Sequence, residues 1–118
     1  MRKIIFYSYL KCSTCRKAAK WLKSKDFEFE FIDIVKEPPI VNYLNLALEQ
    51  FSDDRKRIFN TRGKAFKNLN LDIYCLSREE IIQLLLSDGK LIKRPFLVYE
   101  EKKLILGFNE IEYASQLI

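Results

Sequence analysis

Histidine is absent from this chain of 118 residues, which removes several common kinds of catalytic and metal site. Without an imidazole the protein has no histidine general base, no cysteine–histidine nucleophile pair and no histidine zinc ligand. The three cysteines would need carboxylates to complete a structural four-ligand zinc site, which is an unusual ligand set. We therefore expect neither a metal nor a bound cofactor.

Long apolar runs are also missing. The longest stretches, such as residues 81–86, are far shorter than the roughly 20 residues of a membrane-spanning helix. Ile4, Ile5 and Phe6 make too short a run for the core of a secretory signal. With 48% hydrophobic residues, three Gly and three Pro, the composition is that of an ordinary globular chain. We expect one domain over residues 1–118, in a monomeric cytoplasmic protein without membrane contact.

Positive charge is in excess, with 21 Lys and Arg against 16 Asp and Glu, a formal net charge of +5. Such an excess favours an anionic substrate or partner. The cations are spread over residues 11–25, 55–67 and 90–94, a distribution typical of solvated surface. We therefore expect no direct contact with nucleic acid.

Two strands and a helix are expected in the first third of the chain. Alternating β-branched and aromatic residues predict strands over residues 3–9 and 27–34, the second with its phenylalanines on one covered face. Helical spacing between them predicts a helix over residues 12–25, with Ser13 and Thr14 as candidate caps. A unit of this kind makes a right-handed crossover and two parallel strands.

The middle of the chain is predicted to be helical. Ser77 and Glu80 match a capping box, which opens a helix that runs through Leu86 and stops near Gly89. Residues 41–87 are too long for a single crossover, so we expect a helical layer inserted beside the sheet. The other segments expected here are a helix over residues 41–51, a short helix from Ser52 or Asp53 through Phe59, and a short turn or helix over residues 64–69.

A β-hairpin and a last helix are expected in the C-terminal third. Residues 96–99 and 102–107 have strand composition and are joined through two glutamates. Asn109 and Glu112 suggest a capped helix to the end of the chain. Because the hairpin adds antiparallel strands to a parallel pair, the chain predicts an α/β fold with a mixed four-stranded sheet.

The motif Cys12-Ser13-Thr14-Cys15 lies where the first predicted strand gives way to the first helix. Unpaired backbone N–H groups and the helix dipole stabilise an anion at such a position, and a thiolate is such an anion. Lys11 and Arg16 flank the motif with positive charge. Cys12 is therefore predicted to be a nucleophile with a lowered pKa, and Cys15 to resolve a mixed disulfide at Cys12.

Other roles for the cysteines remain open. Cys15 shares a helix face with small and apolar side chains and could be a core residue. The redox role accounts for the position of the pair at a strand–helix boundary, so we favour it. Cys75, within Ile73-Tyr74-Cys75-Leu76, is expected to be a buried structural cysteine.

Arg94-Pro95 directly precedes the predicted hairpin. An X–Pro peptide bond adopts the cis form at modest cost, although a plain loop proline fits the sequence equally well. Taken alone, Arg94 and Arg62 would be surface cations.

Four blocks of sequence carry a resemblance to a known family. They are Cys12-Ser13-Thr14-Cys15-Arg16-Lys17-Ala18, Asn60-Thr61-Arg62 with Lys64 and Phe66, Arg94-Pro95, and Gly107-Phe108-Asn109-Glu110. In these blocks, and from end to end, the chain resembles the glutaredoxin-coupled arsenate reductase (ArsC) family, and within it the Spx and YffB-like branch. The resemblance implies a thioredoxin-like fold with a helical insertion.

The resemblance also implies roles for individual residues. Cys12 would be the attacking thiol, and a cis Pro95 would face the cysteines. Arg16, Arg62 and Arg94 would converge near that thiol to bind an oxyanion such as arsenate, whose oxygens match guanidinium donors. Glutathione, glutaredoxin or thioredoxin would reduce the oxidised pair again.

Departures from the family pattern bear on the substrate. Arsenate reductases of this type carry a histidine at the position of Ser8 and an arginine at that of Gly107, and they usually lack the second cysteine. We therefore expect a thiol-dependent oxidoreductase that acts on an oxyanion or, in preference, on a thiol or disulfide substrate. The alternative is a redox-switched transcriptional regulator of the Spx type that binds RNA polymerase, although Asp54 stands where Spx proteins have a glycine.

Overall fold

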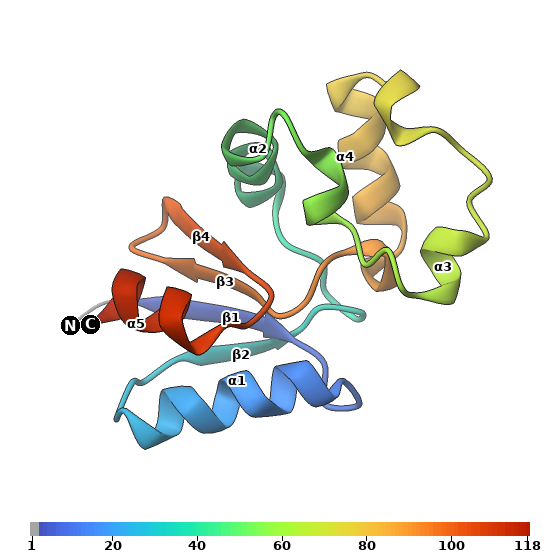
Figure 1. The fold of residues 1–118 in the computed structure, drawn as a ribbon. Helices are drawn as coiled ribbons and strands as arrows, with labels where there is room; N and C mark the ends of the chain where they lie inside the picture. The colour runs from blue at the N-terminus through green and yellow to red at the C-terminus, as the bar shows by residue number, and fades with distance from the viewer. Residues whose placement is uncertain (1–2) are drawn as a thin grey trace.

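A four-stranded sheet forms the centre of residues 3–118, the part of the chain that the computed structural model describes (Figure 1). In spatial order the strands are β2 (Glu30–Asp33), β1 (Ile4–Ser8), β3 (Phe96–Tyr99) and β4 (Lys103–Leu106). β1 and β2 are parallel, whereas β1 with β3 and β3 with β4 are antiparallel. The predicted mixed sheet is confirmed.

Helices cover both faces of this sheet. α1 (Ser13–Ser24) and α5 (Glu110–Leu117) pack on one face, and the helices between β2 and β3 pack on the other (Figure 1). Because successive side chains of a strand point to opposite faces, a doubly covered strand is apolar along its whole length. Alternate residues of β1 accordingly enter two separate hydrophobic clusters, Ile5 and Tyr7 in one and Ile4 and Phe6 in the other.

The first helix begins at Ser13, one residue earlier than it would if Ser13 were its N-cap. Cys12, with extended angles of φ −94° and ψ 120°, is the N-cap residue of α1. Ser13 and Thr14 already lie within the helix and are exposed, so the prediction that they cap it is wrong. The reason is the turn after β1, where the Cys12 N–H donates to the Tyr9 carbonyl oxygen at 3.0 Å and starts the helix immediately.

β2 is shorter than the predicted strand over residues 27–34. Phe27 and Phe29 precede it and pack in the cluster beneath α1. Phe31 is 42% exposed although its register partner Phe6 is fully buried, so the expected covered face is wrong at Phe31. β2 is one of the two edge strands and has a neighbouring strand on one side alone.

The chain between β2 and β3 forms the helical insertion. Its short helix before residue 59 has Asp54 at the N-cap without a side-chain cap, so the predicted caps Ser52 and Asp53 are wrong. No helix within residues 3–118 has the length and apolar character that crossing a membrane requires. The elements of the insertion are α2 (Val41–Gln50), α3 (Lys64–Lys67) and α4 (Arg78–Ser87), with the 3₁₀ helices η1 (Arg55–Ile58), η2 (Ile73–Cys75) and η3 (Gly89–Leu91).

Two predicted helix starts are confirmed. Ser77 Oγ accepts from the Glu80 N–H at 3.1 Å while Glu80 Oε1 accepts from the Ser77 N–H at 2.9 Å, which completes the capping box of α4. At α5 the Asn109 side chain accepts from the Glu112 N–H at 3.0 Å. Both caps are local, which is why a sequence pattern alone identifies them.

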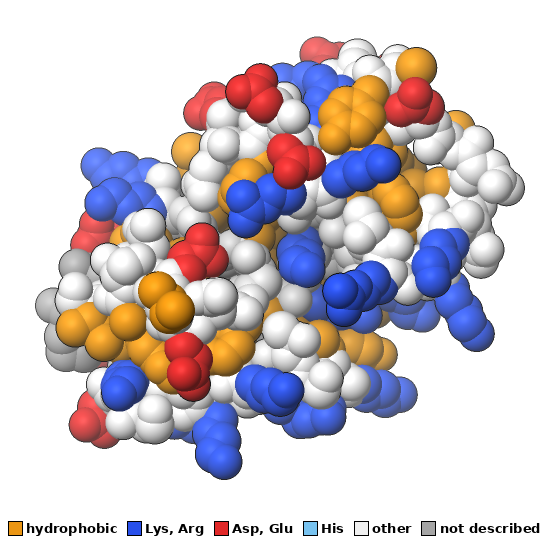
Figure 2. All heavy atoms as spheres, viewed as in Figure 1, with side chains coloured by type: hydrophobic (Ala, Val, Ile, Leu, Met, Phe, Trp, Pro, Cys, Tyr) orange, Lys and Arg blue, Asp and Glu red, His pale blue; other side chains and the backbone are white. Residues whose placement is uncertain are grey.

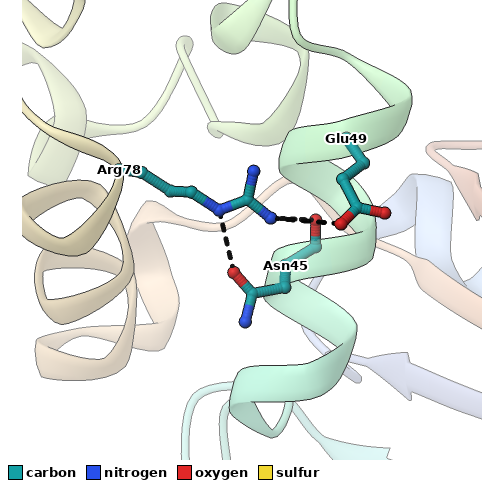
Figure 3. Close-up of polar contacts among 3 residues, drawn as sticks. All are labelled: Asn45, Glu49 and Arg78. Atoms are coloured by element: carbon teal, nitrogen blue, oxygen red, sulfur yellow. Dashed lines mark hydrogen bonds and ion pairs between the residues drawn. The ribbon is translucent and has the colours of Figure 1, made fainter.

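Arg78 ties α4 to α2 within the insertion (Figure 3). Its Nε donates to Asn45 Oδ1 at 3.0 Å, and its Nη2 donates to the Asn45 carbonyl oxygen at 3.1 Å and lies 3.4 Å from Glu49 Oε1. These bonds join the two long helices of the insertion. The insertion is therefore held together by polar contacts at its surface as well as by its apolar core.

Candidate functional site

Cys12 lies at the junction of β1 and α1, at the end of the sheet that faces the helical insertion (Figure 1). Its carbonyl oxygen accepts from the Arg16 N–H at 3.1 Å, as the first intrahelical bond of α1. The side chain of Cys12 is half-buried. At this position it stands beside the unpaired N–H groups of the first helical turn, where a negative charge is stabilised.

Three groups around Cys12 favour its thiolate. Partial burial raises the pKa of the Cys12 thiol, but the Cys15 N–H, the Cys15 thiol and the Arg94 guanidinium together bring that pKa below its ordinary value. The thiolate is the nucleophilic form of a cysteine. The surroundings of Cys12 therefore favour its thiolate.

Cys15 has the opposite environment. Its side chain is 1% exposed, and burial raises the pKa of the Cys15 thiol to about 11. Ser8, itself 3% exposed at the end of β1, opposes that rise in pKa through a hydrogen bond to the sulfur. Cys12 and Cys15 each perturb the pKa of the other, so the two sulfurs interact directly. Cys15 therefore keeps its proton at neutral pH.

Arg94 reaches Cys12 from the loop before β3. The Arg94–Pro95 peptide bond is cis, and β3 pairs with β1 so that Phe96 lies opposite Tyr7, which brings residue 94 to the end of β1. The Arg94 guanidinium carbon lies 5.1 Å from the centre of the Tyr9 ring. Its Nη1 is buried and has no acceptor among residues 3–118, so the guanidinium retains hydrogen-bonding capacity for a thiolate or a bound anion.

A cavity of about 870 Å³ opens beside Cys12, between the sheet and the helical insertion. Asp54 and Glu112 are the acidic residues of its lining, against five basic ones. Figure 2 shows Lys and Arg side chains grouped on this face, where the insertion meets the sheet. The cavity is therefore suited to an anionic ligand. Its basic residues are Lys56, Arg57, Arg62, Lys93 and Arg94.

The three arginines of the predicted anion site are placed differently. Arg94 contacts Cys12, and Arg62, an exposed residue before α3, lines the same cavity. Arg16 is exposed and is absent from the cavity lining; its Nη1 donates to the Leu10 carbonyl oxygen at 2.8 Å. The structure thus brings Arg62 and Arg94 to the cavity, while Arg16 closes the turn between β1 and α1.

Cys75 is exposed, and the prediction of a buried structural cysteine is wrong. It lies at the end of η2, where its Sγ is 3.6 Å from Asp72 Oδ2. The apolar side chain of Ile73 is the buried one in this segment, and a 3₁₀ turn points neighbouring residues in different directions. Among the described residues, no group of three or more Cys, Asp or Glu side chains is arranged to hold a metal.

Three cations of the cavity were missed as functional candidates. Lys56, Arg57 and Lys93 belong to the basic segments that the sequence shows, but their spacing resembles ordinary solvated surface. They come from η1 and from the loop before β3, which are distant in sequence and meet only in the folded chain. The excess of positive charge in the sequence was the one feature that could have indicated these basic residues as part of an anion-binding site.

Comparison with known proteins gives consistent matches along the chain. A sequence model of the ArsC family matches residues 7–115. The uncharacterised protein YusI of Bacillus subtilis is 42% identical over 95% of this chain and 96% of its own. The global transcriptional regulator Spx of Lactiplantibacillus plantarum is 35% identical over 92% of this chain and 82% of its own. The crystal structure of a possible arsenate reductase from Streptococcus mutans matches with a TM-score of 0.82 and 40% identity, over 90% of this chain and 91% of that one.

Proposed function

Since the chain belongs to the ArsC family, whose structural relatives share its thioredoxin-like fold, we propose that it is a thiol-disulfide redox protein. Cys12 is the nucleophile and Cys15 the resolving thiol. The substrate is a disulfide or an oxyanion, held in the basic cavity by Arg62 and Arg94. A disulfide is favoured, because Ser8 and Gly107 replace the histidine and the arginine of arsenate-reducing relatives.

The contrast between the two cysteines carries this proposal. Cys12 is half-buried beside a basic cavity with a lowered pKa, whereas Cys15 is buried behind it with a pKa raised to about 11. An attacking thiol needs access and thiolate character, and a resolving thiol needs proximity to the first sulfur. Two cysteines that served only to fill the core would not require this difference in exposure and in thiol pKa.

The reduction of a disulfide proceeds in two exchanges. The Cys12 thiolate attacks one sulfur of the substrate, a bond forms between the two sulfurs, and the other half leaves as a thiolate that takes up a proton. Cys15 then loses its proton and attacks Cys12 Sγ, which releases the second half as a thiolate. Two electrons pass from the cysteine pair to the substrate, and the pair becomes a disulfide.

An external thiol completes the cycle. The oxidised pair requires two electrons from glutathione, glutaredoxin or thioredoxin, and no cofactor is bound. These reductants are kept reduced in the cytoplasm, where the proposal places the protein.

Trapping of the mixed disulfide tests the proposal. The reduced protein is treated with the disulfide of mercaptoethanol and analysed by mass spectrometry under acid quench. Wild type is expected to end with a Cys12–Cys15 disulfide and no adduct on either of these two cysteines, whereas the exposed Cys75 can take up an adduct of its own. Cys15→Ser is expected to retain one adduct on Cys12, because no second thiol resolves it.

Two further variants make the result specific. Cys12→Ser is expected to leave Cys15 unmodified at neutral pH. Cys75→Ser, which lacks the exposed thiol, is expected to form the same Cys12–Cys15 disulfide as wild type. An adduct on Cys15 in place of Cys12, or an adduct on Cys12 that persists in wild type, would remove the assignment of nucleophile and resolver.

A regulator of the Spx type is the second candidate function, favoured by the 35% identity to Spx over 92% of the chain. In this function the Cys12–Cys15 pair switches binding to RNA polymerase. Asp54, exposed at the rim of the cavity, replaces the glycine of the polymerase-contacting loop, and burying a carboxylate in an interface is costly. Purified polymerase should retain the oxidised or reduced protein on a column if this function is correct; passage of both forms would exclude it.

A further inference from the structure

Lys93 lies across the backbone of Gly107, at the edge of the basic cavity. A Cβ atom built on Gly107 would lie 3.1 Å from Lys93 Cε. Gly107 also has a φ of +80°, which other residues rarely adopt, and its N–H donates to the Pro95 carbonyl oxygen at 2.8 Å. The bare backbone at position 107 therefore leaves room for the aliphatic part of Lys93.

The backbone of Lys93 is held in place by the helical insertion. Its N–H donates to the Ile58 carbonyl oxygen at 2.8 Å, and the Asn60 N–H donates to the Leu91 carbonyl oxygen at 2.8 Å. These bonds flank an antiparallel bridge between Phe59 and Ile92. The base of the Lys93 side chain is therefore fixed where the insertion meets the loop before β3.

Lys93 brings its charge to the cavity without an acidic partner. Within residues 3–118 it takes part in none of the ion pairs, and the acids of the cavity lining, Asp54 and Glu112, lie beyond ion-pair distance of it. It is the direct neighbour of Arg94, whose Nη1 lacks an acceptor among the same residues. Two adjacent cations thus have capacity for an anionic ligand beside Cys12.

The size of the cavity bears on the kind of anion. At about 870 Å³ the cavity is in the range of sites that hold extended organic molecules, roughly 300–1,000 Å³, and is far larger than a tetrahedral oxyanion. A ligand that reaches both Cys12 and Lys93 needs a sulfur at one end and a negative group at the other.

We propose that Lys93 is a substrate-binding residue of this cavity and that the substrate is the disulfide of an anionic thiol, whose carboxylate Lys93 binds. This deepens the proposed function and depends on it. The Cys12 thiolate attacks the disulfide, an S–S bond to Cys12 forms, and the substrate S–S bond breaks. The second half leaves as a thiolate, and Lys93 holds the carboxylate so that the reacting sulfurs meet.

Two probes of different charge test the proposal. Dithiobis(nitrobenzoate) carries a carboxylate on each half, and dithiodipyridine is neutral near neutral pH. Both release a coloured product, so stopped-flow absorbance gives the rate constant of each reaction with the reduced protein. Cys75→Ser is the background for all variants, because Cys75 is exposed and would react as well.

Lys93→Gln is expected to slow the reaction with the anionic probe about fivefold, the loss of one screened charge interaction, and to leave the neutral probe unchanged. Lys93→Arg, which keeps the charge, is expected to retain most of the wild-type rate. Lys23→Gln makes the same change of charge in the last turn of α1, and both rates should remain unchanged.

The outcomes separate this proposal from the proposed function. If Cys12 reacts rapidly with both probes and Lys93→Gln slows both or neither, the role of Lys93 is wrong and the redox function stands. If Cys12 reacts no faster than a free thiol with either probe, the redox function itself fails.

Discussion

The Arg94 guanidinium carbon lies 5.1 Å from the centre of the Tyr9 ring, with the same guanidinium acting on Cys12. Tyr9 belongs to the turn that leads from β1 to Cys12, whereas Arg94 comes from the loop before β3. A cation over an aromatic face is attracted to it, and this contact limits the positions that Arg94 can take. The turn that presents Cys12 therefore also helps to place the cation that lowers its pKa.

Replacement of Arg94 should make Cys12 less reactive. Arg94→Gln removes a positive charge that stabilises the thiolate, so the pKa of Cys12 should rise and its alkylation by iodoacetamide near neutral pH should slow severalfold. The pKa is measured from the pH dependence of that rate. Arg62→Gln is the matched control, because Arg62 is exposed on the cavity wall and absent from the groups that shift the Cys12 pKa. Equal profiles for Arg94→Gln and wild type would contradict the role of Arg94.

The three cysteines should alkylate in a fixed order as pH rises. Cys12 has a lowered pKa and should react first. Cys75 is exposed, but the nearby Asp72 carboxylate raises the pKa of its thiol, so it should need a higher pH than an ordinary cysteine. Cys15, buried with a pKa of about 11, should react last. Peptide mass spectrometry gives the order, and unfolded protein, in which all three should react alike, is the control.

Loss of the α4 cap should destabilise the protein. Ser77→Ala removes the side-chain acceptor of the capping box and should lower the free energy of unfolding by about 1 kcal/mol. Ser13→Ala at the start of α1 is the control, since Ser13 makes no capping bond, and its effect should stay within about 0.5 kcal/mol. Urea unfolding followed by circular dichroism measures both. A larger loss for Ser13→Ala would mean that the caps are assigned wrongly.

Gly89 should tolerate no side chain. A Cβ at this position would meet the Ile34 carbonyl group, with its carbon at 2.9 Å, and the Val35 Cα at 2.9 Å. Both are backbone atoms and cannot rotate away, so Gly89→Ala should cost about 1–3 kcal/mol of stability, measured by urea unfolding.

Gly63→Ala is the comparison for this variant. Its added Cβ would meet chiefly the Asn60 side chain, with Nδ2 at 2.7 Å, and a side chain can move. The loss of stability should therefore be clearly smaller than for Gly89→Ala. Equal losses in the two variants would contradict the close approach of η3 to the segment after β2.

The sequence by itself determined the local and periodic features of this protein. The strand and helix order, the capping box at Ser77 and the cap at Asn109 follow from patterns within a few residues, and the structure confirms them. The ArsC family and the thioredoxin-like fold, predicted from four sequence blocks, are confirmed as well. Helix caps and apolar periodicity depend on residues that are close together in the sequence, which is why they can be predicted from it. The roles of Cys12 and Cys15 stay predictions.

Only the tertiary structure decided which cations reach the cysteines and which side chains are covered. Lys93 and Lys56 resemble surface residues in the sequence and line one cavity in the fold, whereas Arg16 stays outside it. The local sequence likewise did not predict that Cys75 and Phe31 are exposed. Each of these outcomes depends on which distant segment packs against the residue, and contacts between distant segments exist only after the β3–β1 pairing and the helical insertion have formed. For that reason the sequence placed Cys12 and Cys15 at a helix start, and the fold supplied the charged cavity around them.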